Sequence, residues 1–300
     1  MQVSEPNSPL APMDSAQAAP EKGAIAPAPS YGHIRAEQVG AVLHITLNRP
    51  EARNAMSLQM VAELQQALQA AEATSVSEGA VRVVVLRGAG GHFCAGADLK
   101  DMAGARMRSM QREAGAPDPI AEVNAAFGRL CVAYAQTPLA VVAVLEGTVM
   151  GGGFGLACVA DVVLAGETAS LRLPETSLGV VPAQIAPFLV ERLGYSQAKR
   201  LAVTGGRLDA AAAHRMGLVH ELCSADDLPE TLNSVLSDIL ACAPGALAAT
   251  KALMQQARFS PAADLVEQAA AVFAHSAQSA EGLEGMTAFI QKRKPTWAVT

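Results

Sequence analysis

The stretch VRVVVLRGAGGHFCAGADLK, residues 81–100, decides the fold class. Val81–Arg87 is a nearly continuous run of β-branched residues, which is typical of a strand buried on both faces inside an α/β layer. Glycine and alanine end the run at Gly88–Gly91. The residues that follow, His92–Lys100, are mostly small, so the backbone can approach a ligand closely and point its N–H groups at an oxygen atom. The alternative is a tight turn that only connects a strand to a helix.

Strand and helix patterns continue on both sides of this stretch. Strands are predicted at residues 41–47, 140–145 and 161–165, and helices at 186–193, 196–203 and 210–216. Ser57 can cap a further helix, whose apolar positions are Leu58, Val61, Leu64 and Leu68. Residues 104–120 carry glycine, proline and mixed charge, which predicts a flexible loop or a broken helix. The alternation favours an α/β core followed by a mostly helical tail.

Composition limits the class of protein. The 300 residues are 51% hydrophobic, which excludes wholesale disorder. The net charge of −6 argues against a nucleic-acid or anionic-membrane surface. No apolar run approaches the roughly 20 residues that a membrane helix needs. Five cysteines, an odd number without a CxxC pair, fit a reduced compartment. We therefore expect a cytoplasmic protein that binds neither nucleic acid nor membrane.

Residues 1–30 differ from the rest of the chain. They contain six prolines and seven alanines but no aromatic residue. Because proline fits neither a helix interior nor a central strand, this segment is predicted to be a disordered arm. The absence of arginine argues against an organellar transit peptide.

A second glycine-rich segment, Gly147–Gly155, follows the predicted strand at 140–145. Its glycines precede apolar residues, a pattern that predicts a helix N-terminus with unpaired N–H donors and a positive dipole. A dinucleotide site is the alternative, because glycine-rich turns after strands also bind pyrophosphate. That alternative fits poorly, since Leu156 stands where the motif requires glycine or alanine.

Two further groups are candidates for chemistry. Glu175 lies among apolar residues in LPETSLG, residues 173–179, where burial would raise its pKa and suit it to acid–base work. The alternative is a solvated loop or a helix cap. Lys292–Lys294 fit either a phosphate group or a solvated helix end. The sequence has no GxSxG, Walker A or HExxH motif and its six histidines show no ligand spacing, so no metal or redox cofactor is expected.

Five segments occur in an order that is similar to one family. They are LNRPEARNAMS (47–57), VVLRGAGGHFCAGADLKDM (84–102), VAVLEGTVMGGGFGLACVADVVLA (142–165), LPETSLGVVP (173–182) and GMTAFIQKRKP (285–295). Together they resemble the crotonase, or enoyl-CoA hydratase/isomerase, family over residues 33–297. The resemblance implies an α/β fold in which a spiral stack of ββα units over 31–220 is followed by C-terminal helices over 221–300. Those helices assemble homotrimers, which commonly pair into hexamers.

The resemblance also implies a substrate and a site. The substrate is an acyl-coenzyme A thioester, so coenzyme A is part of the substrate and no separate cofactor is implied. By motif position, the N–H groups of Ala97 and Gly152 bind the thioester carbonyl and stabilise an enolate, and Glu175 is the catalytic acid and base. The residues predicted to bind substrate are Arg53, Ala95, Asp98, Leu99, Lys100, Gly151, Phe154, Gly155, Gln184, Phe289 and Lys292. In the family, the last two positions often reach coenzyme A from a neighbouring subunit.

The sequence departs from the family pattern at one position. Typical hydratases hold the attacking water between two glutamates, but here the first position is Gly155, in GGGFGLA where GGGCELA is usual. Only Glu175 remains. One base is enough to move a double bond, which favours an isomerase. Residues 154–156 and 181–188, however, resemble bacterial hydratases of methylglutaconyl- and isohexenylglutaconyl-CoA, which also lack the first glutamate.

Three functions stay open from the sequence. Hydration of a branched or glutaconyl-type enoyl-CoA is favoured, with glycine at position 155 vacating volume for such an acyl group. Candidates to replace the missing carboxylate are the distal carboxylate of the substrate, Gln184 and an extra water molecule, and Arg172 is a candidate partner for the distal carboxylate. The alternatives are a Δ-isomerase with Glu175 as its only base and a non-catalytic acyl-CoA-binding protein.

Overall fold

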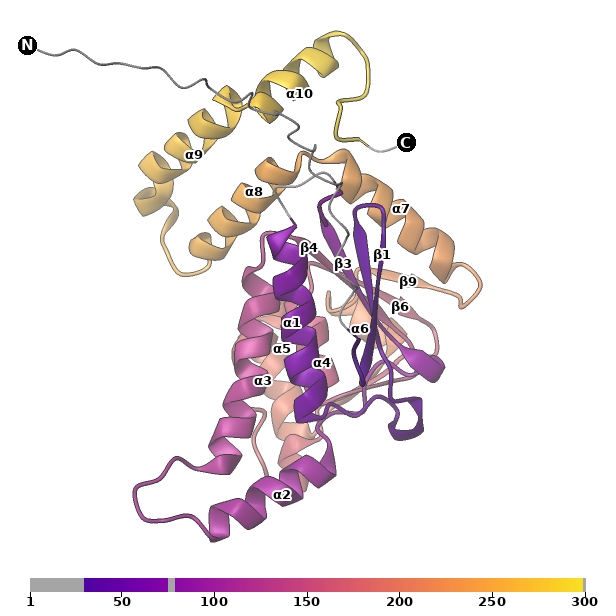
Figure 1. Ribbon diagram of the computed structural model, residues 1–300, viewed down its shortest axis with the longest axis vertical. Helices are drawn as coiled ribbons and strands as arrows, with labels where there is room; N and C mark the ends of the chain where they lie inside the picture. The colour runs from indigo at the N-terminus through magenta and orange to yellow at the C-terminus, as the bar shows by residue number, and fades with distance from the viewer. Residues whose placement is uncertain (1–29, 75–78, 299–300) are drawn as a thin grey trace, which may run out of the picture. The chain divides into compact units, whose positions relative to one another are not determined.

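Six strands form one sheet in the computed structural model, which describes residues 30–74 and 79–298 (Figure 1). Their order is β1 (Ile34–Val39), β2 (Val42–Leu47), β3 (Val83–Gly88), β4 (Ala140–Leu145), β6 (Val162–Gly166) and β9 (Glu221–Cys223). The β1–β2 pair is antiparallel, and the other neighbouring pairs are parallel. The four strands predicted from the sequence are confirmed, with their ends shifted by no more than two residues.

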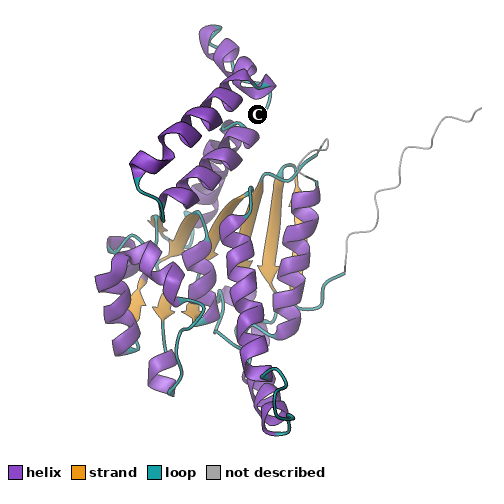
Figure 2. Ribbon diagram, turned by 90° about the vertical axis from the view of Figure 1, so that its left-hand side faces the viewer, coloured by secondary structure: helices purple, strands orange, loops and turns teal. Residues whose placement is uncertain are grey.

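Four helices gather on one side of this sheet (Figures 1 and 2): α1 (Leu58–Ala73), α3 (Pro119–Gln136), α4 (Gly152–Val159) and α5 (Ala186–Thr204). Ser57 caps α1 as predicted, because its side chain accepts a hydrogen bond from the Met60 N–H at 3.1 Å. The two helices predicted at 186–193 and 196–203 are confirmed as the two halves of α5. Gly194, with φ of +70° and ψ of 158°, is not helical and kinks α5 between them.

Side chains of β3 pack on both faces of the sheet. Val84 and Leu86 belong to the large core cluster that includes residues of α1, α3, α4 and α5. Val83 and Val85 belong to a second cluster, with leucines of α7 (Leu228–Ala241). Because successive side chains of a strand point to opposite faces, the β-branched run at 81–87 fits this arrangement, and the predicted burial on both faces is confirmed.

Of the two alternatives predicted for residues 104–120, the broken helix is confirmed. Helix α2 (Leu99–Met110) continues through the first of these residues, and α3 begins at Pro119. Aspartates set both starts: Asp98 accepts from the Lys100 N–H at 2.8 Å, and Asp118 accepts from the Ile120 N–H at 2.9 Å. Only the segment between the two helices is a loop.

A smaller sheet positions the loops of interest. It consists of β5 (Thr148–Met150), β7 (Ser170–Arg172) and β8 (Arg207–Asp209). The 3-10 turn η3 (Glu175–Leu178) follows β7, and α6 (Ala210–Arg215) follows β8. Because β5 and β7 pair in parallel, with Met150 opposite Arg172, the residues that follow them lie close together. Further single turns of 3-10 helix span Pro50–Ala52, Ala89–Gly91 and Ala262–Leu265.

Helix α7 covers the second face of the sheet, and α8 (Pro244–Ala257) meets the sheet at the amino ends of the parallel strands. Helices α9 (Val266–Gln278) and α10 (Ala280–Ile290) pack against α8 and each other. Arg82, just before β3, donates to Trp297 O at 2.8 Å and to Leu240 O at 3.0 Å. Lys251 of α8 donates to Leu139 O, just before β4, at 2.6 Å. The carboxyl ends of β3 and β4 are therefore left for the glycine-rich loops.

Residues 31–300 form one compact unit. The predicted arm falls, apart from Ser30, outside the described residues, and the division between residues 220 and 221 stays a prediction. Within the described ranges, no single helix is both long and apolar enough to cross a membrane. Taken together, α7 and α8 have the length and the composition of a membrane span, but the two helices are bent by 96° relative to each other.

Candidate active site

The two glycine-rich loops lie side by side. Cys94 bridges to Val149: its N–H donates to Thr148 O at 3.0 Å, and its carbonyl accepts from the Met150 N–H at 2.8 Å. A Cβ atom added to Gly153 would lie 2.6 Å from Cys94 Cβ, so only glycine permits this approach. The loops after β3 and β4, far apart in sequence, thus form one surface.

Two backbone N–H groups on this surface have no hydrogen-bond partner in the described part of the chain. The Met56 N–H donates to Gly96 O at 2.7 Å and the Asp98 N–H donates to Met56 O at 3.0 Å, so the bridge leaves the N–H of Ala97 unused. Gly152 is the first residue of α4, where N–H groups lack an intrahelical acceptor. The same two donors are predicted from the sequence to bind the carbonyl oxygen, and the positive end of the α4 dipole adds to their effect.

Glu175 reaches the same place from the loop after β7. A Cβ atom added to Gly151 would lie 3.2 Å from Glu175 Oε1 and 3.4 Å from Gly96 Cα, so the carboxylate lies beside Gly151 at the point where the two glycine loops meet. Its Oε2 atom is buried and has no hydrogen-bond partner among the described residues. Burial raises the pKa of Glu175 above its usual range. The carboxylate can therefore exchange a proton at a higher pH than an ordinary glutamate.

The raised pKa makes stability depend on pH. The folded protein keeps the Glu175 proton to a higher pH than the unfolded chain does, so stability falls as pH rises from the ordinary value of 4.5 through the raised pKa. Glu175→Gln is therefore expected to melt at a higher temperature than the wild type at pH 8, with the difference vanishing at pH 4. Thermal melts at both pH values check this, and an equal difference at the two would contradict it.

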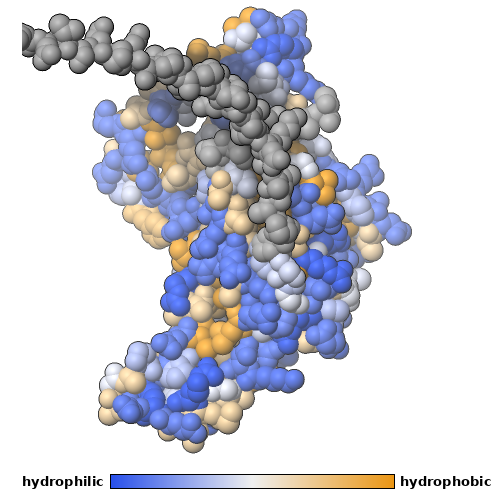
Figure 3. Space-filling view, viewed as in Figure 1, coloured by the Kyte–Doolittle hydropathy of each residue, from blue (hydrophilic) through white to orange (hydrophobic). Residues whose placement is uncertain are grey.

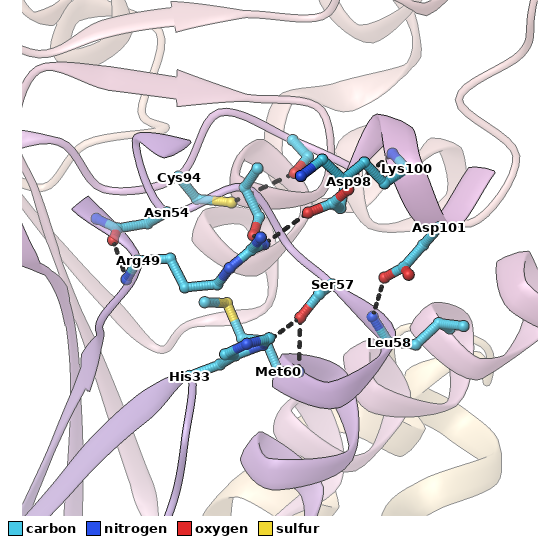
Figure 4. Close-up of polar contacts among 12 residues, drawn as sticks. His33, Arg49, Asn54, Ser57, Leu58, Met60, Cys94, Asp98, Lys100 and Asp101 are labelled. Carbon is cyan, nitrogen blue, oxygen red and sulfur yellow. Dashed lines mark hydrogen bonds and ion pairs between the residues drawn. The ribbon is translucent and has the colours of Figure 1, made fainter. Parts of the chain in front are cut away.

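Arg49 and Asp98 hold the loop that carries Ala97 (Figure 4). Arg49 Nη1 lies 2.7 Å from Asp98 Oδ2 and donates to Ala55 O at 2.6 Å. The other carboxylate oxygen of Asp98 accepts from the Lys100 N–H. Both carboxylate oxygens of Asp98 thus have partners within the chain, where they anchor the loop and cap α2, and a contact of Asp98 with substrate stays a prediction.

The side chain of Asn54 holds the start of the loop after β3 through hydrogen bonds. It is fully buried, its Nδ2 donates to the carbonyls of Ala89 and His92 at 2.9 and 2.7 Å, and its Oδ1 accepts from the Arg49 N–H at 2.9 Å. Asn54→Ala is expected to destabilise the protein by roughly 2 to 4 kcal/mol, because three backbone groups lose their partner. Asn48→Ala, at a half-buried residue without a side-chain hydrogen bond in the described chain, should change stability by less than about 0.5 kcal/mol. Urea denaturation of both variants makes the comparison.

The space beside Gly155 is filled. A Cβ atom added there would lie 3.1 Å from Phe127 Cζ and 3.1 Å from Ile185 Cγ1, closer than ordinary van der Waals contact. The prediction that glycine at this position vacates volume for the acyl group is corrected, because a ring from α3 occupies that volume.

Phe154 and Gln184 have structural partners. Phe154 is fully buried in the large core cluster, so its side chain packs the fold. Gln184 donates to Asn124 Oδ1 at 2.8 Å and lies against Gly128, both on α3. No hydrogen bond joins Gln184 to Glu175 in the described chain. The predicted substrate contact of the Phe154 side chain is corrected to packing, because that side chain is fully buried, and the role of Gln184 at the substrate stays a prediction.

Four residues border the loop after β3 or the glycine loop after β5. Leu99 and Lys100 are exposed at the start of α2, and the Ala95 N–H donates to Arg53 O at 3.0 Å, which brings exposed Arg53 beside the loop. Arg172 is half-buried on β7 and makes no ion pair within the described residues. Contacts of these residues with substrate stay predictions.

Phe289 and Lys292 are not brought to the glycine loops of their own chain. Helix α10 packs against α9 and α8, and α8 meets the sheet at the amino ends of the strands, whereas the glycine loops follow the carboxyl ends (Figure 1). A role for Phe289 and Lys292 at coenzyme A therefore requires a second copy of the chain.

The paired donors and the buried carboxylate agree with what the motifs imply. A sequence profile described as "Enoyl-CoA hydratase/isomerase" matches residues 37–299. The chain belongs to this family. The predicted family and the predicted α/β crotonase fold with C-terminal helices are confirmed.

Relatives place the chain among hydratases of the family. Pseudomonas aeruginosa AtuE shares 49% sequence identity, with a TM-score of 0.84 over 89% of this chain and 100% of that one. An enoyl-CoA hydratase/isomerase from Marinobacter aquaeolei shares 48%, with a TM-score of 0.83 over 89% and 99%. The 2,3-dehydroadipyl-CoA hydratase of Escherichia coli is 32% identical over 85% of this chain and 94% of its own. The predicted class, a lyase of the enoyl-CoA hydratase type, is confirmed at this level.

Sequence reasoning missed residues that only the fold brings to the site. Arg49 and Asn54 lie within the family motif at 47–57, and that motif was the sequence feature that could have indicated their place near the site. Phe127 and Asn124 lie on α3 outside every quoted motif, and helical periodicity alone gives no reason to place them beside α4.

Proposed function

We propose that this member of the crotonase family adds water to the double bond of an enoyl-CoA thioester. The Ala97 and Gly152 N–H groups bind the thioester oxygen, and Glu175 is the single carboxylate that acts on the acyl chain. The observation that carries the proposal is the carboxylate of Glu175, which lies beside Gly151 and whose buried Oε2 atom has no hydrogen-bond partner in the described chain. Such a group is costly to bury, which indicates a substrate or water as its partner.

Hydration balances with one carboxylate. Ionised Glu175 removes a proton from a water molecule while the water oxygen bonds to the β-carbon. The π electrons of the double bond shift toward the carbonyl oxygen, where the two N–H donors stabilise the enolate. Protonated Glu175 then gives its proton to the α-carbon, which restores the thioester and the carboxylate.

A branched or glutaconyl-type chain is the proposed acyl group. The likeness of residues 154–156 and 181–188 to glutaconyl-type hydratases supports it, as does the absence of a carboxylate at Gly155. Arg172 stays the candidate partner for a distal carboxylate. Its carbonyl accepts from the Gly151 N–H at 3.3 Å, so Arg172 lies next to the glycine loop of the site.

Turnover on paired substrates tests the proposal. A 3-methylglutaconyl-type CoA should give a product heavier by one water molecule. A 3-enoyl-CoA converted to an isobaric conjugated product, without hydration of the first substrate, would establish the isomerase instead. Tight acyl-CoA binding with no turnover of either ester would establish a non-catalytic binding protein. Mass spectrometry of the separated esters distinguishes the three.

A homotrimer, or a hexamer of two trimers, is the proposed assembly. Exposed apolar residues on and next to α8 to α10 include Phe259, Phe273, Met286, Phe289 and Ile290. Figure 3 shows hydrophobic side chains at the surface of this part of the chain. A second copy seated there would bury them and supply Phe289 and Lys292 to its neighbour. Light scattering after gel filtration should give about three or six times the 30.8 kDa chain mass, and a single-chain mass would contradict this. We place the assembly in the cytoplasm, because all five cysteines are free.

A further inference from the structure

The ring of Phe127 lies against the first turn of α4. A Cβ atom added to Gly152 would lie 3.3 Å from Phe127 Cε2, and one added to Gly155 would lie 3.1 Å from Phe127 Cζ. Residues three apart on a helix share a face, so one ring covers both positions. The face it covers begins at the Gly152 N–H, the donor assigned above to the thioester oxygen.

Neighbouring contacts fix the ring in place. Ile185, which is buried, approaches the Gly155 position at the same 3.1 Å as the ring. The Asn124–Gln184 hydrogen bond at 2.8 Å ties α3, one turn before Phe127, to the loop that carries Ile185. Phe127 itself is only partly buried, unlike Phe154, so this residue lies at the edge of the core and not inside it.

We propose that Phe127 is the residue that determines acyl-chain specificity, and that it forms a coupled pair with Gly155. The ring occupies the place that a second carboxylate side chain would take from position 155, and it forms an apolar wall along the acyl chain. This proposal rests on the proposed function in one respect, the binding of the thioester oxygen at the Gly152 N–H. Gly155 lies about 4.5 Å further along the helix axis, a distance comparable to that from the carbonyl oxygen to the carbons that react.

This pairing explains why position 155 is glycine. Any side chain there meets the ring and Ile185 at once, at 3.1 Å from its Cβ atom, so a glutamate at position 155 requires the Phe127 ring or Ile185 to move. An aromatic wall offers no hydrogen bond to water, so the chain orders water from the Glu175 side. The size of the wall then limits the substituent that the acyl chain can carry next to the reacting carbons.

Binding of saturated esters tests the specificity role without any turnover. The affinities of hexanoyl-CoA and 3-methylhexanoyl-CoA are measured by calorimetry for the wild type and Phe127→Ala, with Phe127→Leu as the milder variant. The branched-to-linear affinity ratio is expected to rise by about tenfold in Phe127→Ala. Phe188→Ala is the matched control, because Phe188 is also half-buried against the same core but lines the cavity between α3, α5 and α8. Equal ratios in the two alanine variants would overturn the proposal.

A double-mutant cycle tests the coupling. Gly155→Glu alone is expected to lower the melting temperature by several degrees, and Phe127→Ala in the same chain should recover much of that loss. Additive melting shifts would overturn the coupled pair. Because neither experiment uses turnover, a wild type that hydrates no enoyl-CoA would refute the proposed function and leave this inference to be decided by the binding ratio and the melts.

Discussion

Glu175→Gln is expected to lower kcat for enoyl-CoA turnover by at least about a thousandfold. Glutamine keeps the size of the side chain but can neither take a proton from water nor return one to the α-carbon. The substitution leaves the N–H groups of Ala97 and Gly152 in place, so the affinity for a saturated acyl-CoA should stay within about threefold. Steady-state kinetics and calorimetric titration of the same preparation measure the two quantities.

Glu146→Gln is the control for this substitution. Glu146 is also partly buried, but its carboxylate faces Arg87 at 3.6 Å, so its loss should leave kcat nearly unchanged. In the wild type, kcat/KM should fall as pH decreases through the raised pKa of Glu175, because the ionised form is the base. Retention of more than a tenth of kcat in Glu175→Gln would remove Glu175 from the chemical step.

Gly151→Ala is expected to lower kcat by about a hundredfold or more. Gly151 has φ of +49° and ψ of −116°, a conformation that side chains disfavour. Its added Cβ would also lie 3.2 Å from Glu175 Oε1 and 3.4 Å from Gly96 Cα, so either the base or the Ala97 loop must shift. The same kinetic assay, together with circular dichroism to confirm folding, measures the effect.

Gly40→Ala is the control for Gly151→Ala, because it introduces similar backbone strain at a position far from Glu175 and the glycine loops. Gly40 has a similar φ of +57° in the β1–β2 turn, and an added Cβ there meets no atom within 4 Å. The control should lose stability, by about 1 to 2 kcal/mol, and keep full activity. If both glycine variants kept full activity, the close contact between Gly151 and Glu175 would have no catalytic meaning.

Local elements could be predicted because their signals are local. The β-branched run before Gly88 specifies a strand buried on both faces, and Ser57 specifies a helix start, whatever the rest of the chain does. The same holds for glycine-rich turns at the ends of strands. Between the two alternatives left open for residues 104–120, the caps at Asp98 and Asp118 favoured a broken helix over a continuous loop.

The sequence by itself therefore determined the family, the four central strands β2, β3, β4 and β6, and the three groups proposed for the chemistry: Ala97, Gly152 and Glu175. Only the tertiary structure decided what surrounds them. It assigned Asp98 to an ion pair with Arg49, and it filled the space at Gly155 with Phe127, a residue 28 positions earlier in the chain. The physical reason is that hydrogen-bond signals along a segment are short-range, whereas the volume next to a residue belongs to whichever helix packs there.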